Sequence, residues 1–160
     1  MNLLMTVERT TLMQTPEDDA IQLWVTQAVA AANRSVPSSP ELSIRITDMD
    51  EAAQFNETYR DKTGATNVLS FPATPPPETD SGLLGDLVIC APLVIKEAKT
   101  QDKQATAHWA HLVMHGVFHL LGYNHQTAGE AEALEMLEFN ALPSLGYANP
   151  YDLPAPLERR

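Results

Sequence analysis

The chain has 160 residues, 44% of them hydrophobic, which is enough for one domain with a sizeable core and too short for two of ordinary size. Its formal net charge of −11 excludes binding of nucleic acid through overall charge, because affinity for phosphates comes largely from Lys and Arg. The single cysteine, Cys90, excludes an intramolecular disulfide, and we expect it to be a small buried residue.

The hydrophobic pattern predicts strands interleaved with helices, a mixed α and β fold. We expect strands at residues 4–10, 42–47, 68–71 and 84–91. We expect helices at residues 16–32, 48–59, 92–101, 105–121 and 127–142, followed by an irregular tail over 143–160. Thr15 and Pro16 predict the N-cap and first turn of the first helix, and Thr127 with Glu130 predicts a capping box for the last.

Two further expectations concern the surface. The last helix carries four glutamates that we expect to include a solvated acidic face: Glu130, Glu132, Glu135 and Glu138. The N-terminus lacks a charged start followed by a long apolar stretch, and the longest apolar run, residues 87–95, contains Pro92. We therefore expect a cytoplasmic protein with no membrane anchor.

Three histidines within eleven residues predict a metal site. On a helix over residues 105–121, His115 and His119 are four apart and share one face. Gly122 then allows the left-handed turn that brings His125 back toward that face. Three imidazoles with a fourth position left for water are the ligands of a catalytic zinc, so we expect one zinc ion bound by His115, His119 and His125.

His108 and His111 lie on the same helix face and compete as ligands. His125 leaves the helix at its C-terminal end, and His111 lies about 6 Å further back at 1.5 Å per residue. We therefore interpret His108 and His111 as packing groups or as groups that support the ligands.

The histidine spacing is also the second half of the metzincin protease signature, in which a glutamate follows the first histidine. This chain has Gly116 at that position, and Gly116 cannot transfer a proton. A zincin-like metallopeptidase is therefore an alternative function that the missing base opposes.

The run from His108 to His125 resembles the signature of the YbeY family of metal-dependent rRNA endoribonucleases, with Asn124 where that family usually has Asp. Four further segments look like that family in its order, and the resemblance covers roughly residues 42–152. They read Asn56-Glu-Thr-Tyr-Arg60, Thr66-Asn-Val-Leu-Ser-Phe-Pro72, Leu84-Gly-Asp-Leu-Val-Ile89, and Leu145-Gly-Tyr147 with Pro150-Tyr151.

The resemblance implies an α+β single domain over residues 1–160, with a mixed four-stranded sheet packed on a zincin-like metal helix. It implies a zinc-dependent endoribonuclease that cuts single-stranded regions of rRNA precursors in small-subunit rRNA 3′ end maturation and ribosome quality control. Its partners would be the small ribosomal subunit and its assembly factors. A guanidinium can bind two phosphate oxygens at once, and Arg60 matches the family's functional arginine, so we expect Arg60 and His115 to be catalytic.

Several roles stay open at this point. Asn67 and Ser70 could bind phosphate or sugar, or serve the strand beside the site, and Asp86 could support the site or cap a turn. A ribosome-assembly factor with a structural metal is a third function, because an acidic protein suits docking on basic ribosomal proteins. Any direct attraction of RNA must come from the metal and from Arg60 and Lys62, since residues 104–158 contain no Lys or Arg.

Overall fold

The computed structural model describes residues 2–32, 36–73, 81–123 and 127–141. The strands are β1 Leu4–Arg9, β2 Glu41–Thr47, β3 Val68–Pro72 and β4 Leu83–Cys90. The helices are α1 Asp18–Ala31, α2 Met49–Tyr59, α3 Ala91–Thr100, α4 Ala105–Leu120 and α5 Ala128–Ala141. All nine predicted elements are therefore confirmed, with small shifts at their ends.

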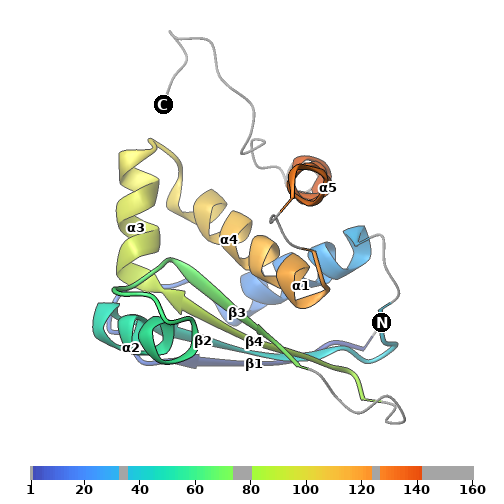
Figure 1. The fold of residues 1–160 in the computed structure, drawn as a ribbon, viewed down its shortest axis with the longest axis horizontal. Coiled ribbons are helices and arrows are strands. Elements are labelled where there is room, and N and C mark those ends of the chain that lie inside the picture. The colour runs from blue at the N-terminus through green and yellow to red at the C-terminus, as the bar shows by residue number, and fades with distance from the viewer. Residues whose placement is uncertain (1, 33–35, 74–80, 124–126, 142–160) are drawn as a thin grey trace, which may run out of the picture.

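The four strands form one mixed sheet, as the family resemblance implied, and their order is β1-β2-β4-β3. β1, β2 and β4 run parallel, and β3 pairs antiparallel with β4, so that β3 is an edge strand. Figure 1 shows α1 and α4 along one face of this sheet. α2 packs on the other face, because Ser70 of β3 bonds to α4 whereas the ring of Phe71, the next residue, contacts Phe55 and Tyr59 of α2.

The core lies between the sheet and the two helices α1 and α4. Alternate residues of β2, namely Leu42, Ile44 and Ile46, are buried in it, as a strand with one face inward requires. α1 contributes five buried residues to it: Ile21, Trp24, Val25, Ala28 and Val29.

α4 is the central element of the fold. It contacts α1, α3, α5, β3 and β4, and most of its side chains are buried. Gly116 allows it to lie close to the sheet, since a Cβ at this position would be 2.8 Å from Leu87 Cδ2. α4 has 16 residues, and no helix in the described part of the chain is long and apolar enough to cross a membrane.

The predicted start of α1 is wrong, whereas that of α5 is confirmed. α1 begins at Asp18, and the hydroxyl of Thr15 accepts a hydrogen bond from Arg9 Nε at 2.7 Å instead of capping the helix. At α5, Glu130 N donates to Thr127 Oγ1 at 3.1 Å and Thr127 N donates to Glu130 Oε1 at 3.2 Å, which is a capping box. A capping box needs only residues three apart at the start of one helix, whereas the partner of Thr15 is Arg9 at the end of the preceding strand β1.

Candidate functional site

A cavity of about 980 Å³ opens between α4, the edge strand β3 and the loop that follows α2. Arg60 and Lys62 line it from that loop, and His115 and His119 line it from α4. The predicted catalytic arginine and two of the three predicted zinc ligands therefore face one space. The third, His125, and the neighbouring Asn124 lie outside the described residues.

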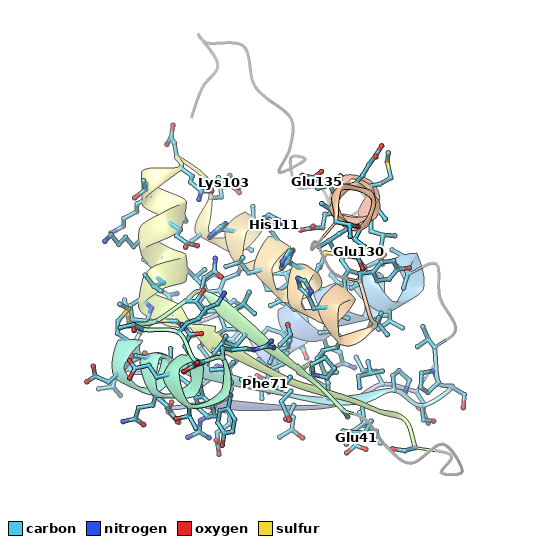
Figure 2. All side chains as sticks on the ribbon, viewed as in Figure 1. Glu41, Phe71, Lys103, His111, Glu130 and Glu135 are labelled. Carbon is cyan, nitrogen blue, oxygen red and sulfur yellow. The ribbon has the colours of Figure 1, made fainter. Side chains whose placement is uncertain are left out.

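Three histidines form the open stripe of α4. From His108 to Leu120 the helix is buried except at His111, His115 and His119, which are partly exposed. These residues follow one another at intervals of four, and Figure 2 shows His111 on the part of α4 that lies next to α5. Polar side chains thus occupy the only face of this stretch that is not packed.

The geometry of His115 and His119 fits a shared metal ion. Their Nε2 atoms lie 3.0 Å apart and their ring centroids 4.5 Å apart. Two imidazoles bound to one tetrahedral zinc, with Zn–N bonds of about 2.0–2.1 Å, bring their nitrogens to about 3.3 Å from each other. A small adjustment would therefore allow both nitrogens to bind the same ion.

The turn after α4 has the predicted left-handed glycine. Gly122 has φ of +99°, its N–H donates to His119 O, and Tyr123 N–H donates to Phe118 O, both at 3.0 Å. These two bonds form a Schellman motif, and the ring contact between Phe118 and Tyr123 is its usual hydrophobic partner. The chain is thereby turned at the end of the helix that carries the histidines.

Glu138 is a member of this site that the sequence analysis misplaced. It is 0% exposed, whereas we expected it on the solvated acidic face of α5. Its Oε1 lies 2.5 Å from His111 Nε2 and 3.3 Å from His115 Nδ1. Burial by itself raises the pKa of this carboxyl, but hydrogen bonds from the two histidines outweigh burial and lower the pKa to about 2.

A sequence signal for Glu138 did exist. Leu134, four residues earlier on α5, is buried at 2% exposure, and side chains four apart share a helix face. Glu132 and Glu135, in contrast, are exposed. A charge at a core position of an amphipathic helix indicates a polar partner inside the fold.

Two sets of donors could hold a metal, and they meet at His115. The nitrogen and carboxylate atoms of His111, His115 and Glu138 all lie within 4.8 Å of one another. The nitrogen of His115 that lies near Glu138 is Nδ1, whereas the nitrogen that lies near His119 is Nε2. The ring of His115 thus has a carboxylate at Nδ1 and a second imidazole at Nε2.

Arg60 is held at the rim of the cavity by neutral groups. Its Nη2 donates to the carbonyl of Ser70, and its guanidinium carbon lies 5.3 Å from the ring centre of Phe71. Among the described residues it forms no ion pair, neither with Glu57 nor with Asp61. Its charge is therefore not neutralised by a carboxylate.

Asn67 lines the cavity, but its amide is used within the protein. Its Nδ2 donates to the carboxylate of Glu97 at 3.1 Å, and its Oδ1 accepts the N–H of Val68 at 2.7 Å. The same carboxylate lies 2.9 Å from Nε2 of His108, which is 3% exposed. These contacts favour structural roles for Asn67 and His108.

Ser70 and Asp86 also have partners inside the fold. Ser70 Oγ donates to the carbonyl of Gly116 at 3.3 Å and so ties β3 to α4. Asp86 accepts a hydrogen bond from Ser43, which lies beside it on the neighbouring strand. Ser43 and Asp86 border a smaller hollow on the α2 face of the sheet, away from the histidines. We therefore assign neither of them to the site.

Comparisons with known proteins agree with this architecture. The sequence model of the family described as "Endoribonuclease YbeY" matches residues 6–146. The chain is 48% identical over 139 residues to "Endoribonuclease YbeY" of Cellvibrio japonicus, covering 87% of this chain and 77% of that protein. It is 50% identical over 140 residues to the protein of the same name from Alkalilimnicola ehrlichii, covering 86% and 83%.

A solved structure shares the fold. The solution structure of TM1509 from Thermotoga maritima superposes with a TM-score of 0.54 at 15% identity, covering 94% of this chain and 99% of that one. At this level of identity the likeness concerns the arrangement of helices and strands alone.

Proposed function

The chain belongs to the YbeY family of endoribonucleases, and we propose that it is a zinc-dependent enzyme that cuts single-stranded regions of rRNA precursors. The observation that carries the proposal is the shared cavity. One wall holds two imidazole nitrogens 3.0 Å apart, and the rim holds a guanidinium that has no carboxylate partner among the described residues. A metal-binding pair opposite a free positive charge suits hydrolysis of a phosphodiester.

The residues would divide the chemistry as follows. His115 and His119, with His125 as the proposed third ligand, would hold one zinc ion per chain, which supplies the Lewis acidity that activates water near neutral pH. Arg60 would bind the non-bridging oxygens of the scissile phosphate. A guanidinium has five N–H donors, so the bond to Ser70 leaves others free for phosphate and holds the planar group in one orientation.

A peptidase would bind its substrate as an added strand on β3, and the geometry of that edge opposes this. Backbone bonds to β4 at Asn67 and Ala73 turn the N–H and C=O groups of Val68 and Ser70 away from the sheet. The next residue with this orientation, Pro72, has no N–H.

The remaining groups of that edge are partly occupied. Arg60 donates a hydrogen bond to the carbonyl of Ser70, and Asn67 Oδ1 accepts one from the N–H of Val68. Gly116 stands where a metzincin has its base, and a side chain there would meet Leu87 and not the cavity. We therefore rank the metallopeptidase well below the nuclease.

The cellular role that we propose follows from the family. The enzyme would take part in 3′ end maturation of the small-subunit rRNA and in ribosome quality control, in the cytoplasm, with the small subunit and its assembly factors as partners. An assembly factor with a structural metal remains the competing proposal. A structural zinc is normally closed by four protein ligands, whereas this histidine pair lines an open cavity.

The test combines metal analysis with two substrates. We expect purified protein to contain zinc, to cut an unstructured RNA, to stop when zinc is chelated and to recover when zinc is returned. Unfolded casein should remain intact under the same conditions. Zinc-loaded protein that leaves RNA intact would support the assembly factor, and chelator-sensitive cleavage of casein would support the peptidase.

A further inference from the structure

Glu138 is the buried charged group that the proposed chemistry does not use. Its side chain is 0% exposed, and it comes from α5, whereas the histidines come from α4. A carboxylate without water around it is strongly unfavourable unless donors compensate its charge. Its contacts with His111 and His115 supply this compensation, so the acid has a defined place in the site.

The contacts with His115 are specific to one ring nitrogen. Both carboxylate oxygens of Glu138 lie near Nδ1, at 3.3 and 3.4 Å. The other nitrogen, Nε2, lies 3.0 Å from Nε2 of His119. A neutral imidazole carries a proton on one nitrogen and a lone pair on the other, so a carboxylate at Nδ1 selects the tautomer with its lone pair at Nε2.

We propose that Glu138 is a positioning residue, which accepts the Nδ1–H of His115 and so turns the Nε2 lone pair toward His119 and the cavity. Its second contact, 2.5 Å to His111 Nε2, fixes the carboxylate in place. A carboxylate behind a metal-binding histidine both orients the ring and makes it a stronger ligand. This inference rests on the proposed metal site at His115 and His119, and it makes that site depend on the docking of α5.

Direct ligation by Glu138 is the competing interpretation. His111, His115 and Glu138 are close enough to surround an ion by themselves. In that arrangement, however, His115 would bind the ion through Nδ1, the nitrogen near Glu138, and would carry its proton on Nε2. Nε2 of His119 would then lie beside the Nε2–H of His115 and would not share the ion. The geometry favours Glu138 behind the ligand, because this uses both nitrogens of His115 at once.

The test uses Glu138→Gln with Glu135→Gln as its matched control on the exposed side of the same helix. The ring tautomer of His115 is read from ¹⁵N chemical shifts of the metal-free protein. Zinc affinity is measured by competition with a chromophoric chelator, and circular dichroism checks folding. Glu138→Asp keeps the charge on a shorter side chain and serves as the conservative variant.

We expect wild type and Glu135→Gln to carry the Nδ1–H tautomer at His115 and to bind zinc equally. Glu138→Gln should lose this tautomer preference and bind zinc about ten- to a hundredfold more weakly, and Glu138→Asp should lie between. An amide can donate as well as accept, so it no longer selects the tautomer.

Two results would overturn the inference. The first is an unchanged tautomer and unchanged zinc affinity in folded Glu138→Gln. The second is loss of zinc from Glu138→Gln and His111→Ala as complete as from His115→Ala, with His119→Ala keeping zinc, which would make Glu138 a ligand. Failure of the proposed function is separate, because the tautomer is measured without metal and without RNA.

Discussion

The proposed metal site depends most on His115, since both of its ring nitrogens have close contacts. A single substitution there removes a ligand and also the partner of a buried carboxylate. His119 and His111 differ in this respect, because each is associated with one of the two possible sites. Comparing the four histidine variants therefore tells the two sites apart.

We expect His115→Ala, His119→Ala and His125→Ala each to lose most of the bound zinc, and His111→Ala to keep it. The reason is that three ligands must share one ion, whereas His111 faces Glu138. Zinc per chain is measured by mass spectrometry of the elements after dialysis. Near-stoichiometric zinc in the triple variant at residues 115, 119 and 125 would contradict the assignment.

Arg60 is expected to act on the transition state. Arg60→Ala should keep its fold and its zinc and cut RNA about a hundredfold more slowly, the scale of losing one preorganised donor. Arg60→Lys should recover only part of the rate, because an ammonium restores charge without the planar pair of donors. Single-turnover rates are measured against RNA concentration for the three proteins.

Lys62 provides the control for simple docking, because it lines the same cavity and its side chain forms no hydrogen bond or ion pair within the described part of the chain. Lys62→Ala should raise the RNA concentration needed for half the maximal rate and leave the saturated rate unchanged. An unchanged saturated rate in Arg60→Ala would remove Arg60 from the catalytic residues.

At the scale of elements, patterns that depend on neighbours in the sequence were predictable. The nine elements, the capping box of α5 and the left-handed glycine after α4 all follow from residues within one or two turns. Features that depend on contacts between elements were not. Thr15 is bonded to Arg9 of β1 and does not cap α1, and the burial of Glu138 depends on how α5 lies on α4.

Close packing of α4 on the sheet depends on Gly116. In Gly116→Ala the new methyl would lie 2.8 Å from Cδ2 of Leu87, which is itself fully buried. Overpacking costs about 1–3 kcal/mol, and the helix preference of Ala returns at most about 1 kcal/mol. We expect a net loss of up to about 2 kcal/mol in the free energy of unfolding, measured in urea on metal-free protein.

Gly129 of α5 is the matched control, because a Cβ there meets nothing within 4 Å. Gly129→Ala should leave the free energy of unfolding unchanged or raise it by a few tenths of a kcal/mol. If Gly116→Ala proved as stable as Gly129→Ala, the close approach of α4 to β4 would not be limiting the residue at position 116.

At the scale of the whole molecule, the chain is strongly acidic and yet has a cavity lined by cations. The net charge is −11, and Arg60 and Lys62 are the basic residues that line the cavity beside the histidines. Repulsion by the rest of the surface limits non-specific binding of RNA. An RNA strand should therefore make few phosphate contacts, all of them close to the site.

The salt dependence of RNA binding measures the number of phosphate contacts. Each neutralised phosphate of a single strand contributes about −0.7 to the slope of log K against log salt, so two contacts predict a slope of about −1.4. Metal-free wild type, which should not cleave, is titrated into a fluorescent unstructured oligonucleotide and followed by anisotropy at several salt concentrations. Lys62→Ala should flatten the slope by about 0.7. A slope of about −4 or steeper would instead mean that RNA is held by basic groups far from the cavity, and the site would then be only one end of a longer binding surface.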